Sequence, residues 1–175
     1  MSRKIVHVIG TGTIGEPLIG LLCDFKNELG IDDVTFHKHT PLTTDRSKVK
    51  SLVKRGARLT SHEEKIDGFN NIGLKVEFTA DAALDRASVV IDCTPKGFGH
   101  ENKKKYYEHH LNNTLGFIAQ GSEFGFGKPY ARGVNDETLI SGEDRFIQVV
   151  SCNTHNLSAI VKTIALDEDL NNLEE

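Results

Sequence analysis

Cys152 stands where an expected strand meets an expected helix, a position that can turn a cysteine into a nucleophile. Residues 145–150 form an apolar run typical of a strand, and the pattern from about Thr154 predicts a helix. Unpaired N–H groups and the macrodipole at a helix N-terminus stabilise a thiolate over a thiol near neutral pH. A small buried hydrophobic residue would fit the same turn, so position alone leaves both interpretations open.

A glycine-rich turn near the start of the chain carries the pattern of a dinucleotide-binding site. Residues 4–9 read as a strand, Gly10-Thr11-Gly12-Thr13-Ile14-Gly15 follows, and an amphipathic helix comes next. Gly10 permits the tight turn, Gly12 lets the pyrophosphate approach the backbone, and Gly15 lets the helix pack on the strand. The phosphates would rest on the helix N-terminus. A purely structural glycine turn is the alternative, but the strand-turn-helix order favours a dinucleotide site.

The end of the second expected strand indicates which dinucleotide is bound. NAD-preferring domains carry a carboxylate there for the ribose 2′-hydroxyl, whereas strand 33–36 runs into His37-Lys38-His39-Thr40-Pro41, and Arg46 follows. Cations and a hydroxyl suit a 2′-phosphate, so we predict NADP as the cofactor, with NAD possible. A solvated polar loop is the alternative. His37 and His39 also suggest a metal, but the sequence shows no third ligand nearby, and we predict no metal site.

The rest of the chain continues the alternation of strands and helices. Helices are expected at 47–55, 81–86 and 102–110, and strands at 73–78, 87–92 and 116–119. The continuous apolar run at 87–92 suits a parallel sheet covered on both faces. The sequence therefore predicts an α/β fold with a doubly wound, mostly parallel sheet of the Rossmann type. Residues 123–142 are expected to form a long loop across the top of the sheet, and Lys103-Lys104-Lys105 a solvated helix face.

Composition agrees with a cytoplasmic enzyme domain. With 175 residues, 38% hydrophobic content and a net charge of -4, the chain can bury one core and has no general attraction to nucleic acid or anionic membranes. The start, Ser2-Arg3-Lys4, leads into a strand too short for a signal peptide, and no apolar run is long enough to span a membrane. Cys23, Cys93 and Cys152 are odd in number and widely spaced, which argues against a disulfide framework and for the reducing cytosol.

Several of these motifs together resemble one family, the archaeal-type (type II) glyceraldehyde-3-phosphate dehydrogenases. The resemblance runs through the glycine turn, Val90–Pro95 with Gly97 and Gly99, Asn102-Lys103, Gln120-Gly121, Val134-Asn135 and Val149–Thr154. It implies that Cys152 is the catalytic nucleophile, that the enzyme is a homotetramer of central carbon metabolism, and that its substrate is a small phosphorylated aldehyde. The chain departs from the family at His155-Asn156, where the family has Thr-Gly, and at Ser122, where it has a second glycine.

The resemblance also divides the chain and assigns its site. Residues 1–150 correspond to the NAD(P)-binding domain, and 151–175 to the cysteine helix, where a catalytic domain starts. The antiparallel remainder of that domain, with the general-base histidine and most of the phosphate-binding residues, is missing from this chain. Along the matching motifs we expect cofactor contacts at Gly10, Thr11, Gly12, Thr13, Ile14, Gly15, His37, Lys38, Thr94, Pro95, Gly97, Gln120 and Gly121. Substrate contacts are expected at Ser151, Asn153 and Thr154.

The chemistry that follows is thioester catalysis. A Cys152 thiolate would add to an aldehyde, hydride would pass to the nicotinamide, and phosphate would take up the thioester, while N–H groups of the helix stabilise the oxyanion. His155 follows Cys152 by three residues, but its ring is poorly placed to reach the substrate hydroxyl, so we favour a surface or substrate-side contact over a base. Two other interpretations stay open: a semialdehyde or acyl-phosphate reductase, and a non-catalytic NAD(P)-binding module that senses redox state.

Overall fold

A computed structural model describes residues 3–164, in which eight strands form one sheet with every strand pair parallel. The spatial order is β4-β3-β2-β1-β5-β6-β8-β7. The strands are β1 (Ile5–Ile9), β2 (Asp33–His37), β3 (Arg58–Ser61), β4 (Phe78–Thr79), β5 (Val89–Asp92), β6 (Gly116–Ala119), β7 (Lys128–Tyr130) and β8 (Phe146–Val149). The strand order reverses at β1, which is the arrangement of a doubly wound sheet, and the predicted fold class is confirmed.

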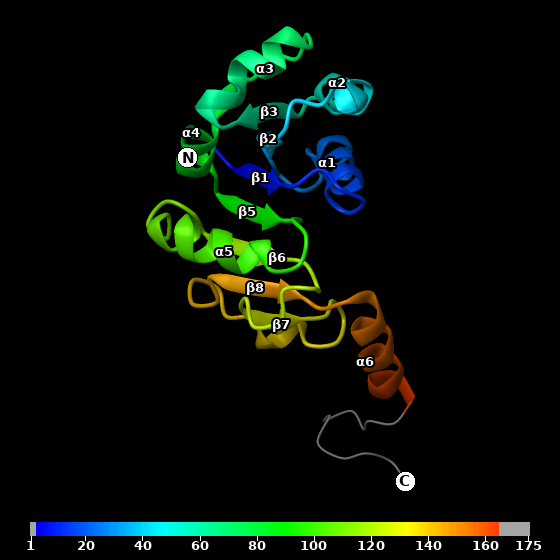
Figure 1. Cartoon of the computed structure of the whole chain (residues 1–175). Coiled ribbons are helices and arrows are strands. Elements are labelled where there is room, and N and C mark those ends of the chain that lie inside the picture. The colour runs from blue at the N-terminus through cyan, green and yellow to red at the C-terminus, as the bar shows by residue number, and fades with distance from the viewer. Residues whose placement is uncertain (1–2, 165–175) are drawn as a thin grey trace.

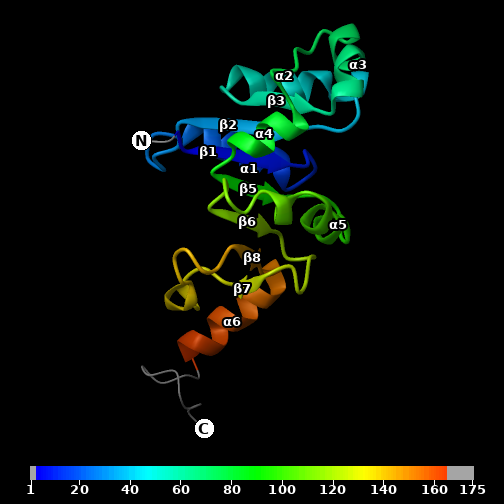
Figure 2. The same cartoon turned by 90° about the vertical axis from the view of Figure 1, so that its left-hand side faces the viewer.

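Helices cover the sheet on both faces. They are α1 (Gly15–Asp24), α2 (Arg46–Lys54), α3 (Ile66–Asn71), α4 (Ala80–Arg86), α5 (Phe98–Lys105) and α6 (Cys152–Ile164). Helices α1 and α2 lie on one face and α4 on the other, while α6 extends away from the sheet beyond β7 and β8 (Figures 1 and 2). None of the residues of α6 is buried. Within the described residues no helix has the length and apolar character needed to cross a bilayer.

The core lies in two clusters, one on each side of the strand order reversal. Val8, Ile19, Phe36 and Leu59 belong to the first, between the sheet and helices α1 and α2. The second includes the buried aromatic residues Tyr107, Phe117 and Phe126, and Tyr107 stacks on Phe117 with ring centroids 4.9 Å apart. Burial of such side chains on both faces explains why the central strands read as continuous apolar runs.

Strand β3 and helix α3 were not predicted, and the expected strand 73–78 is wrong except for its last residue. Strand β3 is short and ends in hydroxyl residues, so its sequence has no apolar run. Its hydroxyls are instead satisfied inside the sheet: Thr60 Oγ1 donates to Phe36 O at 3.2 Å and Ser61 Oγ to Lys38 O at 2.8 Å. These two bonds let polar residues occupy a buried strand without leaving unpaired donors.

The expected loop at 123–142 also contains structure. Strand β7 forms the sheet edge within it, and Asp136–Thr138 makes one 3-10 turn. Pro129 is tolerated in β7 because an edge strand pairs on one side only. The expectation of an uninterrupted loop is therefore wrong at these residues.

The helix expected at 102–110 begins earlier, at Phe98, and its lysine run is not uniformly solvated. The buried Glu123 carboxylate accepts the Gly97 N–H at 2.6 Å and the His100 N–H at 3.2 Å, and so caps the N-terminus of α5. Lys103 Nζ donates to Phe126 O at 2.6 Å and lies 4.2 Å from the Phe146 ring centroid, whereas Lys104 and Lys105 are exposed.

Helix α6 begins at Cys152, two residues before the expected start. Of the predicted segment 151–175, the structure describes the part up to Ile164, and the acidic stretch Asp167–Leu170 lies outside the described residues.

Candidate functional site

The glycine turn has the geometry that its sequence predicts. Gly10 has φ +96°, and a Cβ there would lie 2.8 Å from Cys93 O. A Cβ at Gly15 would lie 2.0 Å from Gly10 O, so the start of α1 sits directly against the turn. A Cβ at Gly12 would meet nothing within 4 Å. Gly10 and Gly15 therefore satisfy the packing of the protein itself, while the space over Gly12 is open to a ligand.

A cavity of about 620 Å³ lies beside this turn, at the carboxyl ends of β1, β2 and β5. This is where the strand order reverses, and open α/β sheets bind their ligands there. Six of the residues expected to bind the cofactor line the cavity: Gly10, Thr11, His37, Lys38, Thr94 and Pro95. The other seven, Gly12, Thr13, Ile14, Gly15, Gly97, Gln120 and Gly121, are not among its lining residues. The N–H of Gly97 is already bonded to Glu123.

Asp92 organises the wall of the cavity at the end of β5. This buried carboxylate accepts hydrogen bonds from Thr94 N and Thr94 Oγ1, from Asn102 Nδ2 at 2.9 Å and from the Tyr107 hydroxyl. Burial, together with the charge of Asp92, raises the pKa of Tyr107 well above its usual value. Tyr107 was not predicted as a site residue, because it lies in the helix expected at 102–110, whose lysine run indicated a solvated face. The network fixes Thr94 and Asn102, both of which line the cavity.

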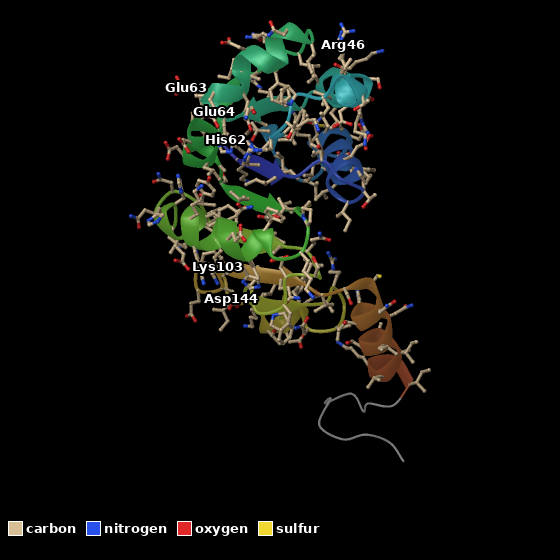
Figure 3. The ribbon with its side chains drawn as sticks, viewed as in Figure 1. Arg46, His62, Glu63, Glu64, Lys103 and Asp144 are labelled. Atoms are coloured by element: carbon tan, nitrogen blue, oxygen red, sulfur yellow. The ribbon has the colours of Figure 1, made fainter. Side chains whose placement is uncertain are left out.

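The cationic character expected at the end of β2 is smaller than the residue types suggest. Lys38 is buried and its Nζ lies 2.5 Å from Asp45 Oδ2, and this hydrogen bond lowers the pKa of Asp45. Burial lowers the pKa of His37 to about 4, helped by the neighbouring His62, so its ring is neutral near pH 7. Arg46 is not among the cavity-lining residues; it is the first residue of α2, on the side of the sheet away from His62 (Figure 3). Of the basic residues expected to meet a 2′-phosphate, Lys38 therefore lines the cavity but is paired with Asp45, His37 is neutral, and Arg46 does not line the cavity.

Two further histidines, His7 and His62, lie close to His37. Burial lowers the pKa of His7 to about 3, and its Nδ1 lies 2.7 Å from Thr35 Oγ1 inside the sheet. His62, which follows β3, comes close to His37 and His39. The sequence showed no third ligand near this pair, because His62 follows His39 by more than 20 residues and only the pairing of β2 with β3 brings it there.

Residues at the ends of β6 and β8 connect the cavity wall to Cys152. Gln120 Nε2 donates to Thr94 O at 3.1 Å. A Cβ at Gly121 would lie 2.5 Å from the backbone N and Cα of Ser151, so a glycine is required where the two strand ends meet. Cys152 does not line the cavity. Cys152 follows β8, which lies two strands away from β5 in the sheet. At ordinary strand spacing β5 and β8 are about 10 Å apart.

Ser151 caps helix α6 and exposes the cysteine. The Thr154 N–H donates to Ser151 Oγ at 3.2 Å, and the His155 N–H to Ser151 O at 2.8 Å. Within the part of the chain that the structure describes, the N–H groups of Cys152 and Asn153 have no acceptor, as expected for a first helical turn. Cys152 is exposed at this end of the helix.

His155 is engaged elsewhere. Its Nε2 lies 2.9 Å from Arg132 O in the loop that follows β7. A ring whose Nε2 is bonded to this carbonyl does not have that nitrogen free to accept a proton, which supports the interpretation of His155 as a contact residue and not a base.

Known proteins similar to this chain are archaeal glyceraldehyde-3-phosphate dehydrogenases. The enzyme of Methanobacterium bryantii is 32% identical over 166 residues, which cover 92% of this chain and 45% of the relative. That of Methanothermus fervidus is 29% identical, with 92% and 45% covered, and that of Pyrobaculum islandicum is 26% identical, with 93% and 44% covered. The chain thus spans less than half the length of these curated relatives.

The fold is that of a Rossmann-type α/β domain, and the sequence similarity indicates a more specific class of protein. Over nearly its whole length this chain is similar to the N-terminal part of archaeal glyceraldehyde-3-phosphate dehydrogenases, which confirms the predicted resemblance. No protein-family model matches the chain. An imine reductase from Pseudomonas sp. is similar in structure over 67% of this chain and 32% of its own, with a TM-score of 0.37 and 18% identity.

Proposed function

We propose that this chain is the cofactor-binding part, with the nucleophile, of an NADP-preferring phosphorylating glyceraldehyde-3-phosphate dehydrogenase. One observation carries the proposal: the same edge of the sheet holds the open glycine turn, the cavity beside it and an exposed cysteine at a helix N-terminus. The archaeal relatives support the enzyme class, an oxidoreductase that uses a nicotinamide dinucleotide. The proposal includes a phosphorylated aldehyde substrate, a homotetramer, a cytoplasmic location and a role in glycolysis or gluconeogenesis.

The residues present fit a dinucleotide. Gly12 leaves open space over the turn, and the N-terminus of α1 offers N–H groups to the pyrophosphate. Thr94, held by Asp92, and Gln120 continue the site along the carboxyl edge toward Cys152. When bound, the nicotinamide supplies the hydride acceptor.

Cys152 carries the covalent chemistry in this proposal. Its thiolate sulfur adds to the aldehyde carbon, and the carbonyl electrons move to oxygen, where the N–H groups of Cys152 and Asn153 stabilise the charge. After the carbon is oxidised, Cys152 holds an acyl group as a thioester, and phosphate releases it by attack at the same carbon. Ser151 fixes the first turn of α6 and so positions both N–H groups.

Acylation of Cys152 tests the proposed function. The general-base histidine and most of the phosphate-binding residues are expected outside this chain, so we expect acylation to be slow. Mass spectrometry should find an acyl adduct on Cys152 that accumulates during long incubation of the chain with glyceraldehyde 3-phosphate and NADP, and none on the Cys152→Ser variant. A nucleophile whose adduct is a thioester should retain it until phosphate is added. An adduct formed only with an amino-acid semialdehyde would favour the reductase, and dinucleotide binding with no adduct from any aldehyde would favour the redox-sensing module.

The preference for NADP rests on Lys38, and its pairing with Asp45 refines the test. We expect Lys38→Glu to weaken NADP binding by about 1 to 3 kcal/mol, because a charge-assisted contact is lost and a repulsion is introduced, while NAD binding stays nearly unchanged. Asp45→Asn is the matched variant: it removes the carboxylate that competes for Lys38 and should strengthen NADP binding alone. Titration of both cofactors measures these effects, and a loss of equal size for NAD would contradict the preference.

A further inference from the structure

Three histidines meet at the rim of the cavity where two neighbouring parallel strands end. His37 is the last residue of β2, His39 follows it by two, and His62 comes directly after β3. One ring nitrogen of each lies within 4.8 Å of the others. Figure 3 shows His62 on the side of the sheet where α4 lies, and α4 contributes Ala80 and Asp81 to the cavity wall.

The backbone holds the three residues in register. The Lys38 N–H donates to Thr60 O at 3.1 Å, and Ser61 Oγ donates to Lys38 O at 2.8 Å. These two bonds tie the segment between His37 and His39 to the residues that precede His62. The convergence is therefore set by the sheet and not by a mobile loop, as a preorganised ligand site requires.

The His37 ring has a buried nitrogen without a hydrogen-bond partner among the described residues. The residue is only 9% exposed, and its Nδ1 is buried without a hydrogen-bond partner among the described residues. Buried ring nitrogens are otherwise nearly always paired. The His62 ring contacts both neighbours edge to face, with centroids 4.8 Å from His37 and 5.5 Å from His39. Three imidazoles this close are either unpaired polar groups or ligands to a shared cation.

We propose that His37, His39 and His62 bind one divalent transition-metal ion of the zinc type. Imidazole nitrogens suit Zn²⁺, Ni²⁺ and Cu²⁺, and three protein ligands leave a fourth tetrahedral position for water or for a group of a ligand in the cavity. Tetrahedral Zn²⁺ needs ligand nitrogens about 3.4 Å apart, so the rings must close by roughly an ångström. His39 is exposed and His62 partly so, and both can turn.

Nearby charge favours a cation. The 3-10 turn after His62 carries the exposed Glu63 and Glu64 with Lys65, and Asp81 lines the same cavity, so carboxylates outnumber cations there. Lys38 points its charge to Asp45 and does not compete at the rim. The metal site needs neither the cysteine nor a dinucleotide. It therefore goes beyond the proposed dehydrogenase function and is tested independently of it.

Zinc titration of the full chain tests this site. The protein is stripped with a chelator and titrated with Zn²⁺ against a chromophoric competitor, without dinucleotide or aldehyde and in a Cys152→Ser background that removes the exposed thiol. We expect one Zn²⁺ per chain, and an affinity reduced about 100-fold or more in His39→Ala and in His62→Ala, since each removes a ligand. His109→Ala, which removes an exposed histidine outside the cluster, is the matched control and should bind as the parent does.

Loss of a metal ligand can be distinguished from loss of folding. His39 is exposed, so His39→Ala should fold even where a change at His62 does not, and circular dichroism checks both variants. Co²⁺ loaded in place of zinc should give the absorption of a nitrogen-ligated tetrahedral site. Three results would overturn the proposal. They are zinc binding by the unchanged chain that is lost in the Cys152→Ser chain, no zinc binding by either chain, and undiminished zinc binding by the His39→Ala variant.

Discussion

Iodoacetamide near pH 7 is expected to alkylate Cys152 at least about 10³ times faster than Cys93. The thiolate is the reacting species, and burial raises the pKa of Cys93 to about 12. Compared with an ordinary cysteine pKa of about 8.5, this lowers the thiolate fraction of Cys93 by about 10³. Cys93 is also only 7% exposed, whereas Cys152 is exposed at the capped start of α6.

Peptide mapping at increasing times of alkylation measures the ratio. Cys23 should also react slowly, because burial raises its pKa and it is half-buried on α1. In denaturant the three cysteines should react at similar rates, which controls for intrinsic reactivity, and Cys152→Ser should remove the fast phase. If the fast thiol were Cys93, the assignment of Cys152 as the nucleophile would lose its basis.

The fold was predictable where the sequence of each element expresses its environment. Strand β1 is buried on both faces, and β5 is buried on one face and half-buried on the other, so both read as apolar runs; the glycine turn follows β1 directly. Strand β3 was missed because its buried hydroxyls are satisfied by Phe36 and Lys38, partners that only the folded sheet supplies. A hydrophobic pattern cannot report a polar strand whose hydrogen bonds are made across the sheet.

The site was predictable in its residues but not in its pairings. Lys38 was identified as a cofactor-binding residue from its type and position. Its charge is partly neutralised by Asp45, which lies in the 3-10 turn that follows and pairs with Lys38 in the folded chain. The three-histidine cluster shows the same limit. His37 and His39 are visible as a pair, while His62 joins them through the register of β2 with β3. Pairings between elements decide which side chains are free to bind a ligand, and they follow from tertiary structure.

Substitutions at Gly12 and Gly15 should separate cofactor binding from packing. In Gly15→Ala the new Cβ would lie 2.0 Å from Gly10 O, a backbone atom that cannot move aside cheaply. We expect a loss of about 3 kcal/mol in the free energy of unfolding, the upper part of the range for overpacking, together with loss of dinucleotide binding. Urea unfolding and calorimetric titration with NADP measure the two effects.

Gly12→Ala is the matched variant, because its methyl group would meet no protein atom within 4 Å and its φ is not in the left-handed region. Its unfolding free energy should be unchanged or raised by up to about 1 kcal/mol, since alanine reduces the freedom of the unfolded chain. Its NADP affinity should nevertheless fall by about 10-fold or more, because the methyl group fills the space into which the pyrophosphate approaches the backbone. A Gly12→Ala protein that binds NADP as tightly as the parent would show that this open space is not the pyrophosphate site, and the turn would then be structural.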